Sequence, residues 1–69
     1  MKLIRWDSED ANRAELKLNA RIAYRDNEGM GPRANASIRH FGIRYGEPVV
    51  YLSDGLWAYL EQIDGVYAS

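Results

Sequence analysis

The chain has 69 residues, with nine Lys and Arg, ten Asp and Glu, one His and no Cys, and its net charge is −1. This length allows one small domain, residues 1–69, and the absence of Cys excludes disulfides and thiolate metal sites. A single His cannot build an imidazole metal site, so we expect neither a metal nor a cofactor.

The near-neutral total hides an uneven distribution of charge along the chain. Every Lys and Arg lies at or before Arg44, whereas residues 45–69 hold four acids and no base. Residues 29–46 contain no acid and interleave basic with aromatic side chains. We therefore expect one basic, aromatic surface, and such surfaces usually contact a partner.

In chain order, residues 2–6 have the composition of a short strand. The clearest period-two alternation of apolar and polar side chains runs over residues 16–24 and predicts a half-buried strand. Residues 26–32 are rich in turn formers. A further strand is predicted over residues 34–45, with a bulge or a short turn near residues 40–42.

The segment that follows the apolar run at residues 49–52 fits two structures. Asp54-Gly55 is a hairpin signal, which predicts a final strand. The apolar spacing over residues 56–63 instead favours a helix, with Ser53 as its N-cap and Gly65 as its C-cap. We favour the helix, which predicts an α+β fold: a small antiparallel sheet of three to four strands with one C-terminal helix packed on a face.

If the two basic strands share one sheet, their polar faces merge into a single surface. Arg offers a planar fork for carboxylate or phosphate, and neighbouring aromatic rings offer stacking. The alternative is a solvated face whose arginines pair with nearby acids. The predicted partner-binding residues are Lys17, Arg21, Arg25, Arg39, His40, Phe41, Arg44 and Tyr45.

The sequence does not predict an enzyme. Ser37 and His40 are the only Ser and His close together, and no third group is positioned to orient the base. No paired-carboxylate or phosphate-loop signature is present. No segment has the pattern of a secretory signal or a transmembrane helix, so we expect a cytoplasmic protein. A homodimer is one way for so short a chain to gain stability.

Residues 38–55, IRHFGIRYGEPVVYLSDG, resemble part of the swapped-hairpin family of bacterial transcription regulators and antitoxins. Phe41-Gly42-Ile43 and Gly46-Glu47-x-Val49 follow the pattern of that family. Asp26 and Gly29 stand where the family has an Asp-x-x-Gly turn. The resemblance implies an interlocked dimer that binds DNA through basic strands.

The layout of the chain is also similar to that of small phage-encoded anti-CRISPR proteins. Residues 1–6 match a Met-Lys-x-Ile-x-aromatic opening strand, and residues 53–63 match a Ser-capped helix that carries aromatic residues. This resemblance implies an inhibitor from a phage or mobile element, acting in the host cytoplasm. Our leading hypothesis is a non-enzymatic protein that blocks a functional surface of a larger bacterial protein or ribonucleoprotein complex. The alternative is the dimeric DNA-binding regulator.

Overall fold

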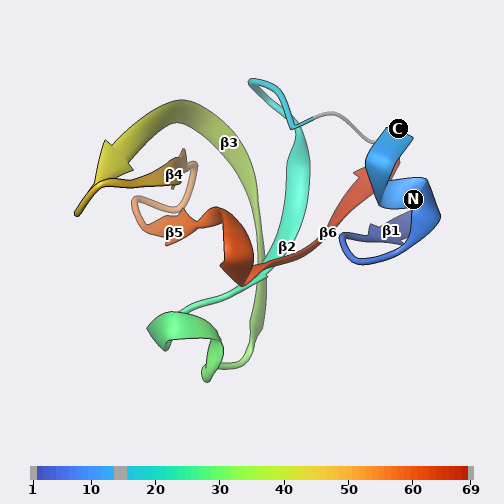
Figure 1. The fold of residues 1–69 in the computed structure, drawn as a ribbon, viewed down its shortest axis with the longest axis horizontal. Coiled ribbons are helices and arrows are strands. Elements are labelled where there is room, and N and C mark those ends of the chain that lie inside the picture. The colour runs from blue at the N-terminus through green and yellow to red at the C-terminus, as the bar shows by residue number, and fades with distance from the viewer. Residues whose placement is uncertain (1, 14–15, 69) are drawn as a thin grey trace.

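The computed structural model describes residues 2–13 and 16–68. These residues form six strands in one antiparallel sheet, in the order β1-β6-β2-β3-β4-β5 (Figure 1). The elements in chain order are β1 (Lys2–Arg5), η1 (Glu9–Arg13), β2 (Arg21–Arg25), η2 (Asn27–Gly29), β3 (Arg33–Arg44), β4 (Glu47–Leu52), β5 (Trp57–Tyr59), η3 (Leu60–Gln62) and β6 (Ile63–Ala68), where η marks a short 3₁₀ turn.

Strand β3 divides the sheet into two halves. Its residues 33–37 pair with β2, and its residues 38–44 pair with β4. A bulge lies between Ile38 and His40, and a bulge bends the strand that carries it. Figure 1 shows β3 as a long arc for this reason. We call β1, β6, β2 and residues 33–37 the terminal half, and residues 38–59 the hairpin half.

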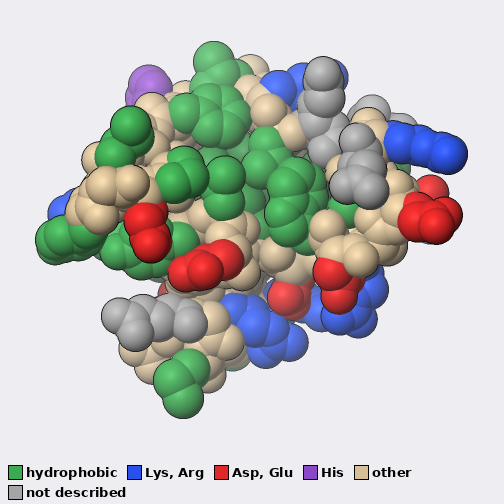
Figure 2. Space-filling view, in the orientation of Figure 1, with side chains coloured by type: hydrophobic (Ala, Val, Ile, Leu, Met, Phe, Trp, Pro, Cys, Tyr) green, Lys and Arg blue, Asp and Glu red, His purple; other side chains and the backbone are tan. Residues whose placement is uncertain are grey.

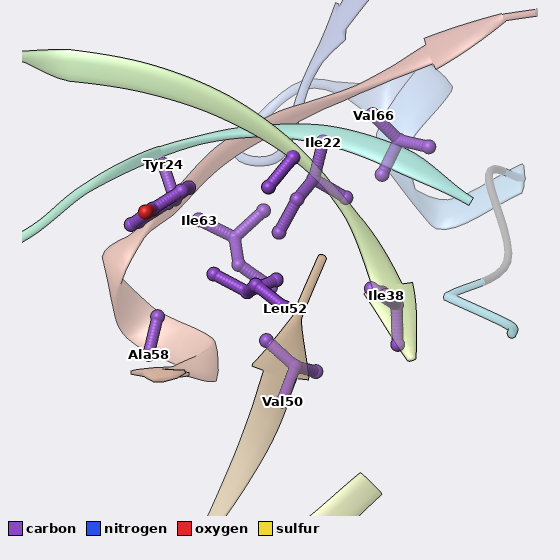
Figure 3. Packing of buried hydrophobic residues seen from close by; sticks show 9 residues of the cluster. Ile22, Tyr24, Ile38, Val50, Leu52, Ala58, Ile63 and Val66 are labelled. Carbon is purple, nitrogen blue, oxygen red and sulfur yellow. The ribbon is translucent and has the colours of Figure 1, made fainter. Parts of the chain in front are cut away.

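The core lies between the two halves, and both contribute to it. Figure 3 shows side chains from β2, β6, β4 and β5 pointing toward one another. Burial of each large aliphatic side chain contributes about 1.5–3 kcal/mol, so this cluster is the main source of stability. Its members are Ile22, Tyr24, Ala36, Ile38, Val50, Leu52, Ala58, Ile63 and Val66.

The predicted α+β fold is wrong, because the described residues contain six strands and no α-helix. Residues 56–63, expected to be a helix, form β5, η3 and the start of β6. The hairpin alternative at Asp54-Gly55 is correct in kind, but its strand, β5, is not the final one, because β6 follows it. Asp54 Oδ1 accepts a hydrogen bond from the Leu56 N–H at 3.0 Å, and Gly55 has a φ of +86°. Within the described residues, no helix is long and apolar enough to cross a membrane.

Gly65 explains part of this error. It was interpreted as a helix C-cap, yet it lies within β6 opposite Arg5 of β1. A Cβ on this residue would collide with the backbone carbonyl of Ile4. Gly65 is therefore required for the close approach of two strands and not for the end of a helix.

Two strand predictions are correct in kind but differ in extent. The alternation over residues 16–24 predicts a strand, but β2 begins only at Arg21 because the chain turns at Asn19, whose φ is +69°. The strand predicted over residues 34–45 corresponds to β3, with its bulge just before the expected position.

Candidate partner-binding surface

Two arginines on the outer face of the terminal half are held by one neighbouring acid. Asp64 Oδ2 lies 3.2 Å from Arg25 Nε and 3.0 Å from Arg33 Nε. Arg25 also donates a hydrogen bond to the carbonyl of Gly31 at 3.4 Å. The interpretation that arginines pair with acids therefore fits Arg25, although the acid comes from β6 and not from the neighbouring turn.

The eight predicted residues fall into two groups along β2 and β3, which are neighbouring strands of the sheet. Lys17, Arg21 and Arg25 lie in the terminal half or the loop before it, and Lys17 and Arg21 are exposed. The other five are consecutive or nearly so in the hairpin half, along β3 and the turn that follows it: Arg39, His40, Phe41, Arg44 and Tyr45. This second group is the one that the fold brings close to additional aromatic side chains.

The β3–β4 turn holds its aromatic residue in an unfavourable backbone conformation. Tyr45 and Gly46 form a two-residue loop with φ values of +53° and +78°, the pattern of a type I′ turn. A positive φ is rare for a bulky residue and costs about 1–2 kcal/mol. The Tyr45 side chain is nonetheless 83% exposed, so no burial offsets this strain. Strain of this kind clusters at functional sites.

The hairpins bring three aromatic rings together beside the guanidinium of Arg44. The Cζ of Arg44 lies 4.4 Å from the centroid of the Trp57 ring and 5.9 Å from that of Tyr45. Trp57 and Tyr59 are in edge-to-face contact at 5.1 Å. They share one face of β5 because alternate residues of a strand point to the same side. We call Tyr45, Trp57 and Tyr59 the aromatic cluster.

The aromatic cluster lines a cleft of about 350 Å³, together with Asp26, Asn27 and Gln62. We call it the aromatic cleft. Gln62 is buried, accepts a hydrogen bond from the Tyr59 N–H at 2.9 Å and donates one to the Arg25 carbonyl at 2.7 Å. This side chain therefore fixes the β5 wall of the cleft relative to the end of β2, from which Asp26 follows.

The hairpin half also leaves one strand edge unpaired. From Arg39 to Arg44, β3 pairs with β4 on one edge, and no described strand pairs with the other. Ile43 is opposite Pro48, which has no N–H, so these two residues form a non-hydrogen-bonded pair of the β3–β4 ladder. Hydrogen-bonded and non-hydrogen-bonded pairs alternate along antiparallel strands, so Phe41, two residues before Ile43, also belongs to a non-hydrogen-bonded pair. The backbone N–H and C=O groups of Phe41 and Ile43 therefore face the open edge.

Both side chains at this open edge are exposed although they are apolar. Phe41 is 49% exposed and Ile43 is 75% exposed. Phe41 and Ile43 lie on the same face of the sheet as the core, because Phe41 is opposite the buried Val50. The apolar face of the sheet thus continues beyond the core into solvent, where it is available to another molecule.

One buried tyrosine connects the two halves. Tyr24 of β2 donates a hydrogen bond from its hydroxyl to Asp54 Oδ2 at 2.5 Å, in the turn between β4 and β5. Burial raises the pKa of Tyr24 well above its ordinary value. The hydrogen bond to Asp54, the charge of Asp54 and the charge of Asp26 raise this pKa further.

The comparisons with known proteins add no relative. No protein family, no curated protein and no solved structure matches this chain. Within the part of the chain that the structure describes, no group of three or more His, Asp and Glu side chains is placed to hold a metal ion.

Four residues of this surface are not among the partner-binding residues predicted from the sequence: Trp57, Tyr59, Ile43 and Asp26. The Asp54-Gly55 hairpin signal would have found the first two, since it places them on one face of a strand. No pattern in the sequence places Asp26 in the same cleft as Tyr45, because this arrangement depends on how distant segments of the chain pack together.

Proposed function

We propose that this protein is a non-enzymatic binding protein that captures an extended segment of a partner protein on the open edge of β3, and thereby blocks a functional surface of that partner. The observation that carries the proposal is the unpaired edge from Arg39 to Arg44, flanked by exposed Phe41 and Ile43. Addition of a strand to such an edge is a recurring mode of peptide recognition. Main-chain hydrogen bonds supply affinity, and alternate side chains supply specificity.

The charges beside this edge favour a segment with acidic side chains. Arg39 and His40 are exposed at one end, and Arg44 is half-buried at the other. We favour a different protein over a second copy of the chain as the partner, because acidic side chains complement Arg39 and Arg44, whereas a second copy presents the same basic groups. The bacterial complex proposed from the sequence is the candidate.

Binding of duplex DNA is the alternative, and it has less support. Arg25 and Arg33 are engaged by Asp64, and Arg44 by Trp57, so three of the seven arginines are less available for phosphate contacts. For a DNA-binding protein, the logarithm of the affinity falls linearly with the logarithm of the salt concentration, and the number of phosphate contacts sets the slope. Retention of duplex DNA with such a slope would support this alternative.

The first step of the test is capture of the partner. The purified chain is used as bait in a bacterial lysate, with and without nuclease, and the captured proteins are identified by mass spectrometry. The candidate is then titrated against the chain by calorimetry. Nuclease-insensitive capture is expected, and capture that disappears with nuclease would favour the DNA alternative.

The decisive variant is Ile43→Pro, with Ile43→Thr as its matched control. Proline removes the N–H that faces the open edge and is tolerated there, because this N–H makes no ladder bond to β4. Threonine keeps both the N–H and the β-branched shape. We expect Ile43→Pro to weaken partner binding about tenfold or more and Ile43→Thr to weaken it less. Equal affinity of Ile43→Pro and wild type would overturn the proposal.

A further inference from the structure

The aromatic cleft is a second feature of the hairpin half, separate from the open edge of β3. We infer that it binds an organic cation, an ammonium or guanidinium group, held between the aromatic cluster and the carboxylate of Asp26. This inference does not depend on strand addition, since none of the residues that line the cleft belongs to the open edge.

The first support is that these rings already accept a cation within the molecule. The guanidinium of Arg44 lies over Trp57 at 4.4 Å and over Tyr45 at 5.9 Å, both within the range of cation–π contacts. Arg44 lies against these rings but does not itself line the cleft. The electron-rich faces of Trp and Tyr attract ammonium and guanidinium groups, and cages of such rings recognise quaternary ammonium ligands.

The second support is the charge around the cleft. Asp26 is half-buried in its wall, and no described residue forms an ion pair with its carboxylate. A neighbouring hollow that shares Tyr59 is lined by Glu47 and Glu61, and neither hollow is lined by Lys or Arg. On the side of the molecule where Figure 1 draws β4 and β5, Figure 2 shows acidic side chains lying among hydrophobic ones. The carboxylates of Asp26, Glu47 and Glu61 therefore favour a cation over an anion in this part of the surface.

The third support is that the cleft is formed before any ligand binds. Gln62 holds the backbone of Tyr59 to the end of β2, and the rings of Trp57 and Tyr59 pack against each other in a T-shaped contact. The volume, about 350 Å³, is at the lower limit of small-molecule sites and suits one small cation or one long side chain. The loss of conformational entropy when a ligand binds is therefore small, which favours affinity.

The test compares two ligands of nearly the same shape. Choline and 3,3-dimethylbutan-1-ol differ in that a carbon replaces the charged nitrogen. Each is titrated against isotope-labelled protein, and the indole N–H of Trp57 is followed by NMR. We expect choline to bind about tenfold more tightly than the neutral alcohol. Equal affinities, or no shift of the Trp57 signal with either ligand, would overturn the inference.

Further ligands distinguish the source of the cation. Nα-acetyl-lysine amide and Nα-acetyl-arginine amide represent side chains of a partner protein, whereas choline represents a free quaternary amine. Tighter binding of the lysine or arginine derivative assigns the site to a basic residue of a protein. Tighter binding of choline assigns it to a small molecule.

Two variants separate the charge of the cleft from its shape. Asp26→Asn keeps the shape and removes the carboxylate, so choline should bind several-fold more weakly while the neutral alcohol is unaffected. Glu9→Gln, which removes an exposed acid far from the cleft, is the control. Ile43→Pro should leave choline binding unchanged, so failure of strand addition is distinguishable from failure of this inference. An Asp26→Asn protein with unchanged choline affinity would contradict it.

Discussion

The outer faces of the two halves differ in how completely their side chains are engaged. In the terminal half, Asp64 holds Arg25 and Arg33, and the Tyr67 hydroxyl donates to Asn35 Oδ1 at 2.9 Å. In the hairpin half, exposed apolar and aromatic side chains surround an unpaired strand edge. Under the proposed function, the binding surface depends on groups that the fold leaves without partners as well as on the basic residues beside them.

The two halves should also respond differently to the same substitution. Gly65→Ala in the terminal half places a Cβ against the backbone carbonyl of Ile4, which cannot move without separating β1 from β6. Gly42→Ala in the hairpin half places a Cβ 2.6 Å from Cε2 of the Tyr51 ring, which can rotate away. We expect Gly65→Ala to lower the free energy of unfolding by about 2–3 kcal/mol and Gly42→Ala by about 1 kcal/mol or less.

Urea denaturation of both variants measures this difference. If Gly42→Ala is the more damaging of the two, the hairpin half is as rigid as the terminal half, and the contrast between them is lost. Intact partner capture by Gly42→Ala, after correction for stability, would show that the Tyr51 ring is not part of the contact.

A second prediction concerns the bond that connects the halves. Tyr24→Phe removes the hydroxyl that donates to Asp54 and should lower the free energy of unfolding by about 1–2 kcal/mol at neutral pH. Tyr67→Phe is the control, since it removes a hydroxyl bonded within the terminal half only. A larger loss for Tyr67→Phe would mean that the Tyr24–Asp54 bond does not connect the halves energetically.

The same pair of residues predicts a dependence on pH. Because burial and Asp54 raise the pKa of Tyr24 in the folded state, folding favours the protonated hydroxyl. This contribution is complete below the pKa of an unfolded tyrosine, about 10, and is lost as the pH rises above it. The free energy of unfolding of the wild type should therefore fall more steeply above about pH 10 than that of Tyr24→Phe. Identical slopes in denaturation series from pH 8 to about pH 11 would contradict the raised pKa.

The sequence predicts the strands of the first part of the chain but neither the last two strands nor how the sheet is assembled. Period-two alternation identified β2 and β3, because it depends only on which side of a strand is buried. The helix predicted over residues 56–63 failed because their apolar spacing fits a helical face as well as a strand followed by a 3₁₀ turn. The close approach at Gly65 and the position of Asp26 beside Tyr45 depend on contacts between distant segments. Arg39 to Tyr45 could be predicted as a group because they are adjacent in sequence.

The smallest expected effect tests whether the strained turn serves binding. Tyr45→Asn places at a φ of +53° a residue that tolerates positive φ values far better than tyrosine. The variant should be more stable by about 0.5–1 kcal/mol, a rise in Tm of a few degrees. It also removes one ring from the aromatic cleft, so choline should bind several-fold more weakly. Gly46→Ala, which introduces a Cβ at a φ of +78°, is the control and should lower Tm.

A gain in stability together with a loss of choline affinity in Tyr45→Asn would distinguish a functional turn from a neutral one. A residue that lowers stability without contributing to binding has no physical reason to occupy the first position of a type I′ turn, where Asn, Asp and Gly are favoured. If Tyr45→Asn is more stable and binds choline as well as the wild type, the strain at Tyr45 is unrelated to the cleft. If it is more stable and binds more weakly, the hairpin half trades stability for a binding surface, whereas the terminal half does not.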